Sequence, residues 1–345
     1  MRFPTLVGLA TAAAGLVGCL ESGPYVSAPP ETKYADLGPS QLSLSGVVYD
    51  PEAFFYSMAM FTPDPAFPND VPPPALFAGT AYLMESSIPG TRVSLVKGAS
   101  VVMTSEPSTE TGSWNVRGFS QDETEFNLVA EPPAAPLALG GGALPEAKYF
   151  KTRTLNPVIP SRTYCMNQVA ISVGDTGALR AIADFKRSQG TNTTVADLLD
   201  PARSGGVLLV WVYSPSFYLN MFTIPSGEIS LSADKGEVFA LEWAPPGSFE
   251  GQTPLGYFGA PGKLSSTGYF AVVMPPNASG PVHITMTDTV TDDESGRPYE
   301  FPELTWNPTP GVTFHRTFGV MPAPPPNPDA EPVPPFLNDW ACTGE

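Results

Sequence analysis

Proline is the residue that most constrains the fold of this chain. It occupies 42 of 345 positions, about 12% against a usual 5% or so, and glycine occupies 32 more. Because proline removes a backbone donor and clashes inside a helix, long helices cannot accommodate this density. Hydrophobic residues make up 42% of the chain, with 20 Phe, 12 Tyr and 5 Trp, so sizeable cores can form. Short elements, many turns and filled cores predict a mainly β protein of sandwich type.

Two blocks of sequence occur twice in the same order. Val48–Pro51 (VYDP) is echoed by Val212–Pro215 (VYSP), and Thr111–Val116 (TGSWNV) by Thr267–Val272 (TGYFAV). Chance similarity between strands of like composition is the alternative explanation. Two matched blocks in one order instead favour an internal duplication. We therefore predict two tandem Greek-key-type β-sandwiches, at 42–172 and 205–321, joined by a short helical connector.

Each copy resembles the carboxypeptidase regulatory-like domain, a transthyretin-like β-sandwich. The likeness rests on Ser45–Asp50 as the first strand, and on a Thr-Gly-x-aromatic turn that opens a middle strand in both copies. The first copy departs from the pattern by a Pro-rich insertion at 63–75. The second copy lacks the usual glycine in its opening strand, apart from Gly206. The resemblance implies a non-catalytic module with a structural or interaction role.

Apolar alternation or continuous apolar runs predict the strands. They fall at 42–48, 78–84, 92–96, 100–104, 113–117, 125–130, 149–155, 163–172, 207–213, 228–231, 238–243, 269–274, 282–287 and 312–320. The run at 207–213 is apolar throughout, which indicates burial on both faces. Residues 173–204 differ, because 178–185 carries one apolar helix face and a second short helix begins at Thr193 or Thr194. This segment is the predicted connector.

The first 18 residues have the layout of a signal peptide. Arg2 precedes an apolar run that ends in Leu16–Cys19 (LVGC). A buried helix or an uncleaved anchor is the alternative, but a spanning helix needs about 20 apolar residues. LVGC resembles the lipobox of bacterial lipoproteins, in which this cysteine, here Cys19, becomes the first mature residue and carries acyl chains such as palmitate. The resemblance implies firm membrane attachment, and Leu20 after the cysteine favours the outer membrane.

The segments that flank the predicted sandwiches lack apolar periodicity. Residues 19–41 are predicted to be a flexible tether, and 322–345 a Pro-rich C-terminal tail that favours extended conformations. If Cys19 is lipidated, the chain retains Cys165 and Cys342. An even pair in an oxidising compartment predicts a disulfide between them. Two isolated thiols are the alternative.

The formal net charge of −17 limits the possible partners. Nucleic-acid binding needs a basic footprint, and the 17 Lys and Arg residues do not cluster. Anionic membranes repel such a surface, so the lipid rather than charge is expected to hold the protein at a membrane.

Asp175-Thr176-Gly177 is the clearest catalytic lookalike, because aspartic proteases carry such a triplet. That chemistry needs a second Asp, and the sequence has no second triplet. Capping of the following helix by Asp175 or Thr176 is the simpler explanation. The two histidines, His283 and His315, are predicted to lie on solvent-facing sides of strands. No catalytic residue, cofactor or metal ligand is therefore predicted.

An acidic cluster leaves calcium open. Oxygen ligands suit calcium, but the EF-hand spacing is absent, and a solvated acidic turn explains the same residues. The cluster consists of Asp288, Asp292, Asp293 and Glu294.

Aromatic residues follow the first strand of both copies, where a loop or strand end is expected. Such positions concentrate binding residues on sandwich scaffolds, although burial in a core is the alternative. The candidate partner-binding residues are Phe54, Phe55, Tyr56, Phe217 and Tyr218.

The sequence thus favours a lipid-anchored protein of the bacterial cell envelope with a non-catalytic binding or structural role. Its expected partner, beyond the membrane, is an envelope protein or a glycan. A carbohydrate-binding module is one alternative, which exposed Trp and Tyr would indicate. A hydrolase with an unrecognised site is the other, which a cleft of carboxylates with opposed pKa shifts would indicate.

Overall fold

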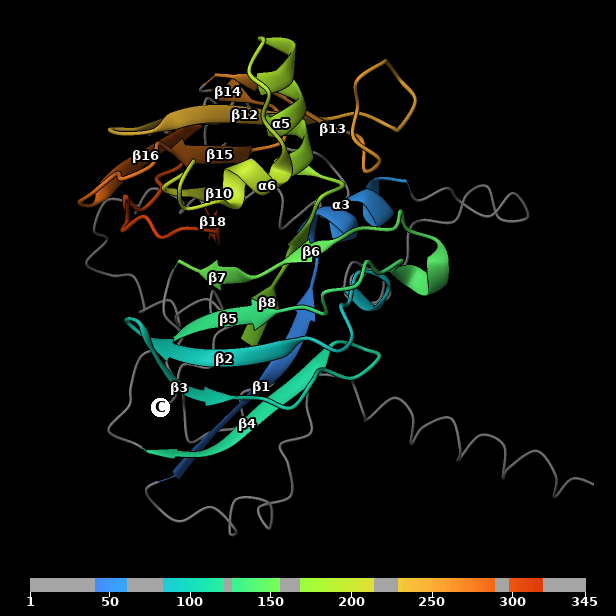
Figure 1. Cartoon of the computed structure of the whole chain (residues 1–345), viewed down its shortest axis with the longest axis vertical. Helices are drawn as coiled ribbons and strands as arrows, with labels where there is room; N and C mark the ends of the chain where they lie inside the picture. The colour runs from blue at the N-terminus through green and yellow to red at the C-terminus, as the bar shows by residue number, and fades with distance from the viewer. Residues whose placement is uncertain are drawn as a thin grey trace, which may run out of the picture.

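The computed structural model describes residues 41–60, 83–120, 126–155, 168–213, 229–262, 264–288 and 298–318. Strands dominate these ranges and form four sheets (Figure 1). The mainly β fold class is therefore confirmed. Within these ranges, no helix is both long and apolar enough to cross a membrane. The signal peptide, the tether up to residue 40, the C-terminal tail and the three cysteines lie outside them, so the predictions made on those residues stay predictions.

The two copies pair their first strand in the same way. In each, the first strand lies between an antiparallel and a parallel neighbour. The first copy uses β1 (Gln41–Tyr49) between β4 (Ser113–Ser120) and β8 (Gln168–Ile171). The second uses β10 (Gly206–Tyr213) between β15 (Tyr269–Met274) and β18 (Val312–Phe318).

The remaining matched strands also pair alike. In each copy a central strand lies between two antiparallel neighbours. These are β2 (Arg92–Lys97), β5 (Asn127–Glu131) and β7 (Thr152–Thr154) in the first copy, and β11 (Ile229–Ala233), β16 (Val282–Asp288) and β17 (Leu304–Trp306) in the second. The repeated blocks of sequence therefore correspond to a repeated pairing scheme.

The Thr-Gly turns explain why these blocks recur. The backbone N–H of Val48 donates to the Gly112 carbonyl at 2.9 Å, and that of Val212 donates to the Gly268 carbonyl at 2.8 Å. Both glycines have positive φ, 73° and 67°. A Cβ at either position would collide with the carbonyl oxygen of the paired strand. Only glycine satisfies both the left-handed backbone and the close approach.

The two copies are joined in one nine-stranded sheet. Its order is β13-β12-β15-β10-β18-β7-β5-β2-β3, and the junction is the parallel pair between β18 and β7. Figure 1 shows β7 between the two halves of the molecule. The additional strands are β3 (Ser100–Thr104), β12 (Glu237–Trp243), β13 (Tyr257–Pro261) and, in the four-stranded sheet, β14 (Leu264–Ser265). A division into two separate sandwiches is consequently not confirmed.

The helices occupy the region where the copies meet. The connector contains α5 (Ala178–Ser188) and α6 (Val195–Leu199), as predicted. The short strands β6 (Tyr149–Phe150) and β9 (Val173–Gly174) pair beside it. Helix α3 (Pro51–Ala59) stands where a loop or strand end was expected, and η1 (Gly140–Gly142) lies in the Gly-rich loop. The strand predicted at 78–84 is wrong at its end, because 83–85 form a helical turn.

Three apolar cores fill the structure. One lies inside the first copy and one inside the second, between the sheets of each. The third joins them, because it combines residues of β1 and α3 with residues of α5, β10, β13 and β15. This shared core, together with the β7–β18 junction, holds the copies against each other.

Candidate functional site

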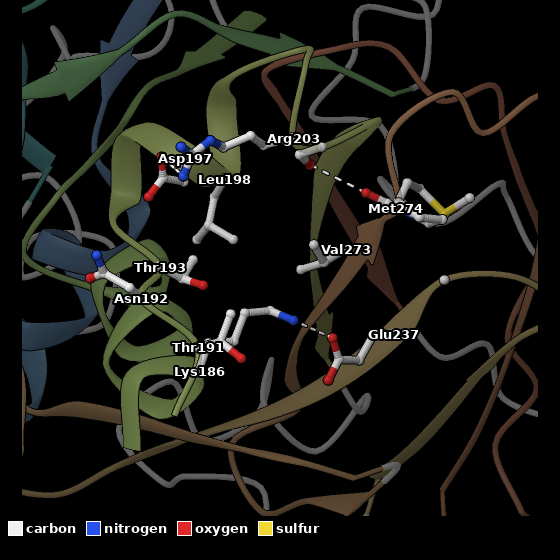
Figure 2. A pocket seen from close by; sticks show the side chains of 13 residues that line it. Lys186, Thr191, Asn192, Thr193, Asp197, Leu198, Arg203, Glu237, Val273 and Met274 are labelled. Carbon is white, nitrogen blue, oxygen red and sulfur yellow. Dashed lines mark hydrogen bonds and ion pairs between the residues drawn. The ribbon is translucent and has the colours of Figure 1, made fainter. Parts of the chain in front are cut away.

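A hollow of about 600 Å³, here called the polar hollow because most of its lining residues are polar or charged, lies where the connector meets β12 and β15 (Figure 2). Its walls come from α5, the turn after it, α6, and the ends of the two strands. The lining residues are Lys186, Thr191, Asn192, Thr193, Asp197, Leu198, Arg203, Ser204, Gly236, Glu237, Val273, Met274 and Pro275.

The α6 side of the hollow is built by a capping box. The Asp197 backbone N–H donates to the Thr194 hydroxyl at 3.2 Å, and the Thr194 N–H donates back to the Asp197 carboxylate at 2.8 Å. Arg203 binds the other oxygen of Asp197 at 2.8 Å. The hydrogen bonds from Thr194, with a smaller contribution from Arg203, lower the pKa of Asp197. Asp197 is therefore an ionised acceptor at neutral pH.

The opposite side of the hollow carries a second ion pair. Lys186, in the last turn of α5, reaches across to Glu237 at the start of β12 (Figure 2). Its ammonium group also lies 5.2 Å from the centre of the Phe239 ring, a favourable cation–π geometry. The hollow thus offers two cations, two anions and several hydroxyl groups, with each charge balanced by a partner.

The first copy contains a second polar cluster, and this one has no access to solvent. Asp50 and Glu52 are both fully buried at the start of α3. Asp50 is the N-cap of the helix and accepts the Glu52 backbone N–H at 2.8 Å. Tyr149 of β6 also hydrogen-bonds to Asp50. Neither acid lines the hollow.

Glu52 connects three elements from distant parts of the chain. One carboxylate oxygen accepts the Ala178 backbone N–H of α5 at 3.0 Å and the Tyr269 hydroxyl of β15 at 2.6 Å. The Tyr257 hydroxyl of β13 donates to the Glu52 main-chain carbonyl at 3.2 Å. A Cβ at Gly177 would overlap the Glu52 carboxylate, so glycine permits this approach. Glu52 thereby occupies the N-terminus of α5, where the helix dipole favours a carboxylate.

Burial dominates the titration of both acids. Burial raises the pKa of Asp50 to about 7, although hydrogen bonds from Ala53, Glu52 and Tyr149 oppose the shift. Burial and the neighbouring Asp50 raise the pKa of Glu52 to about 8. Ionising both carboxylates in an interior without water is unfavourable, because the two charges repel each other.

The candidate partner-binding residues divide between core and surface. Phe55 is buried, with its ring centre 5.3 Å from that of Trp211 and 5.5 Å from that of Trp243. Phe54 and Tyr56 are half-buried against the same core. Phe217 and Tyr218 lie outside the described residues. Burial, the alternative left open by the sequence, therefore holds for Phe55, and partner contact through the others stays a prediction.

The residues around α5 do not cap it as expected. Its N-cap is Gly177, which has no side chain, and the Asp175 carboxylate instead accepts the Lys148 backbone N–H at 2.9 Å. The Thr176 hydroxyl has no hydrogen-bond partner among the described residues. The prediction of a local cap is wrong because Glu52, from the first copy, supplies the acceptor.

The two histidines differ in exposure. His283 is exposed, as predicted, and lies 3.2 Å from Glu303. His315 is buried, contrary to the prediction, because β18 is an interior strand of the nine-stranded sheet. Its burial, with a smaller effect of Arg316, lowers the pKa of His315 to about 4.

The acidic cluster leaves calcium untested. Asp288 is buried at the end of β16, and the other three acids lie outside the described residues. Within the ranges that the structure covers, no group of three or more His, Cys, Asp or Glu could hold a metal ion.

The sequence interpretation missed the buried acids. One local signal was present: Asp50-Pro51 combines a preferred N-cap residue with proline at the first helical position. That pair predicts the start of α3. Nothing local indicates that Glu52, one residue further on, is buried, because its partners come from other parts of the chain.

The sequence matches no protein-family model and no curated protein sequence. Among solved structures, the Bacillus anthracis TIE protein aligns with 81% of this chain and 34% of its own, at 8% identity and a TM-score of 0.21. The chain thus spans about a third of that protein's length.

Two pilins align at similar levels. The shaft pilin SpaA from Lactobacillus rhamnosus GG aligns with 83% of this chain and 100% of its own, at 7% identity and a TM-score of 0.18. The major pilin from Streptococcus pyogenes aligns with 82% and 99%, at 8% identity and a TM-score of 0.19. Scores this low support no conclusion about fold or function.

Proposed function

We propose that this protein is a lipid-anchored component of the bacterial cell envelope, with a non-catalytic binding role centred on the polar hollow. One observation carries the non-catalytic part of the proposal. Within the described residues, the open hollow and the acids with raised pKa values lie in different places, since neither Asp50 nor Glu52 lines the hollow. Acid–base catalysis needs such groups within reach of a substrate.

The chemistry of the hollow suits recognition. Lys186 is paired with Glu237 and Arg203 with Asp197, and hydroxyl and amide groups of 191–193 lie between the pairs. Such a surface presents donors and acceptors at fixed positions without net charge. It fits a small polar ligand that offers both kinds of group, and a zwitterion matches the two ion pairs best.

The aromatic residues weigh against a carbohydrate-binding module. Stacking on sugar rings needs exposed aromatic faces. Among the described Trp and Tyr residues for which burial is defined, each is buried or half-buried. The hollow itself is lined by no aromatic side chain. A structural role remains the second candidate, and the shared sheet and core that fuse the two copies favour it.

Anchoring is tested by labelling cells with a fatty acid. The wild-type chain should incorporate the label, and Cys19→Ser should not. Label retained on the Ser variant contradicts lipidation at Cys19. Cell fractionation of the same two strains then tests the outer-membrane location.

Binding is tested on the full chain by thermal shift with a panel of amino acids, short peptides and monosaccharides. We expect a zwitterionic compound to raise the melting temperature. Lys186→Gln combined with Arg203→Gln should abolish that shift. Arg180→Gln is the matched control, because Arg180 lies on the same helix, pairs with Asp184, and does not line the hollow. A panel without a hit, or a hit that survives the double change, contradicts the binding role.

A further inference from the structure

The buried acids Asp50 and Glu52 play no part in the proposed binding role, yet their placement is unusual. Carboxylates are almost never fully buried unless they are paired. No ion pair to either residue occurs in the part of the chain that the structure describes. Their other partners are the neutral donors already described: backbone N–H groups and tyrosine hydroxyls.

An inventory of the four carboxylate oxygens shows what is missing. Asp50 accepts the Glu52 N–H and hydrogen bonds from Ala53 and Tyr149, and one oxygen of Glu52 accepts the Ala178 N–H and the Tyr269 hydroxyl. The second oxygen of Glu52 is buried and has no partner among the described residues. A buried acceptor without a donor is destabilising, and more so if it is charged. A proton on one carboxyl group supplies a donor and removes one charge.

We propose that Asp50 and Glu52 form an interior proton-binding site. The retained protons stabilise the packing of α3 of the first copy against α5 and against β15 of the second copy. The ligand of this site is the proton itself. With the proton in place, Glu52 can lie at the N-terminus of α5 and beside Tyr269 without leaving two repelling charges in the core. Loss of the retained protons leaves both acids charged, and the contact between the copies weakens.

Several titratable or charged groups among the described residues surround the pair. Those that act on it or lie within its hydrogen-bond chain are Tyr49 of β1, Tyr149 of β6, Tyr257 of β13, Tyr269 of β15, Asp175 before α5, and Arg316 of β18. Burial and the two acids raise the pKa of Tyr269 well above its ordinary value, so this tyrosine stays a donor. The Arg316 guanidinium donates to the Tyr49 hydroxyl at 2.8 Å. The raised pKa values of Tyr49, Tyr149 and Tyr269 keep these three hydroxyl groups protonated near neutral pH.

The sign of the pH effect follows from the raised pKa values. The folded protein binds more protons than the unfolded chain between about pH 4 and pH 8, so stability falls as pH rises through this window and levels off above it. His315 acts in the opposite direction, but only below about pH 6.5, where the unfolded imidazole gains a proton. The range from pH 6.5 to 8.5 consequently isolates the acid pair.

The experiment is a series of melting temperatures of the full chain from pH 6.5 to 8.5. We expect the wild type to lose roughly 5 °C or more across this range. Glu52→Gln and Asp50→Asn should each flatten the profile, because a neutral amide needs no proton and removes the repulsion between the two acids. Glu131→Gln is the matched control, an exposed acid at the end of β5 that should retain the wild-type slope. A flat wild-type profile, or a slope that survives both amide changes, overturns the proposal.

A second measurement needs no variant. Carbon-13 NMR of the wild-type side-chain carboxyl groups should show two that titrate above pH 6. Carboxyl signals that all titrate below pH 6 overturn the proposal, even if the amide variants fail to fold. Elemental analysis of the purified chain separates a proton from a metal: a stoichiometric metal ion that Glu52→Gln removes would also overturn it.

Discussion

The same strands are half-exposed in the first copy and buried on both faces in the second. On the inner face the copies agree: Leu44 and Val48 of β1 are buried, as are the equivalent Leu208 and Val212 of β10. On the outer face they differ, because Val47 is half-exposed whereas the equivalent Trp211 is buried. The matched strands thus share the face on which each copy folds. The outer face differs between the copies because different elements pack on it. On β10 the outer face packs in the shared core, together with α3 and α5.

The junction shows a second difference between the copies. The parallel neighbour of the first strand ends its sheet in the first copy, as β8 does. In the second copy the equivalent β18 continues into β7 of the first. The segment after the first strand differs accordingly, with Asp50-Pro51-Glu52 in one copy and Ser214-Pro215-Ser216 in the other. The first copy alone carries acids at these positions, and its helix α3 contributes to the shared core.

The largest effect is expected from truncating the outer face of β10. Trp211 stacks on Tyr269 with ring centres 4.4 Å apart and lies in the shared core. Trp211→Ala should destabilise the protein by about 3–5 kcal/mol, the usual result of removing a buried Trp. The equivalent Val47→Ala should cost only about 1 kcal/mol. Urea unfolding of both variants measures the difference, and equal losses would break the comparison of the two outer faces.

The equivalent strands β18 and β8 should differ in how they make stability depend on pH. His315 is buried, whereas the equivalent position in β8 is Gln168, as the strand registers show. The pKa of His315 is about 4 in the folded protein, below the ordinary value of 6.5. The neutral, buried His315 therefore lowers stability as pH falls from 6.5 toward 4, and has no such effect above pH 6.5.

His315→Gln, which copies the first half, should remove this loss, roughly 3 kcal/mol between pH 6.5 and 4. Unfolding free energies of the wild type and the variant in the same buffers provide the test. The acid pair contributes equally to both and cancels. A variant that loses as much as the wild type would show that His315 is not the source.

The turn glycines should respond alike, since here the copies are equivalent. Gly112→Ala and Gly268→Ala each combine positive φ with a collision against a strand carbonyl. We expect both to cost about 2–3 kcal/mol. Gly98→Ala is the matched control, because Gly98 also has positive φ but nothing near its missing Cβ, and it should cost about 1 kcal/mol. Thermal unfolding compares the three, and a loss at only one of the two turns would argue against their equivalence.

The smallest effect is expected at the first residue of β5 and its equivalent in β16. Asn127 donates to the carbonyls of Thr154 and Leu155, both at 3.0 Å, and accepts from Arg153 at 2.7 Å beside the junction. Asn127→Ala should cost about 1–2 kcal/mol. Among the described residues, the side chain of the equivalent His283 makes one exposed contact, to Glu303, so His283→Ala should cost less than about 0.5 kcal/mol. Chemical denaturation of both variants resolves the order, and a reversed order would contradict it.

Much of the local structure could be predicted from the sequence. Strands β3 and β15 have the predicted bounds, and the connector contains the two predicted helices. Apolar alternation indicates which side of a strand faces a core, so the local sequence pattern was sufficient to predict these strands. Strands β13 and β17 were missed. Strand β17 has only three residues, and β13 holds Gly259 and ends in Pro261, residues that weaken a strand signal.

The candidate site was less predictable. The hollow requires the connector to lie against β12 and β15, and no local pattern specifies that contact. The same holds for the exposure of the aromatic residues. Phe55 is buried and its neighbours Phe54 and Tyr56 are half-buried because α3 turns one side toward the shared core. Asp50-Pro51 indicated a helix at this position. Nothing in the sequence indicated the surface on which that helix packs.

The sequence by itself determined the β class, the duplicated blocks and the turn glycines, because each depends on residues close together in the chain or on a repeated pattern. Only the tertiary structure decided that the copies share one sheet and that Asp50 and Glu52 are buried between them. The partners of Glu52 that settle its burial lie 126 and 217 residues away, at Ala178 and Tyr269. A carboxylate in a sequence predicts exposure, since burial costs free energy unless donors converge on it. Whether donors converge is a property of the fold.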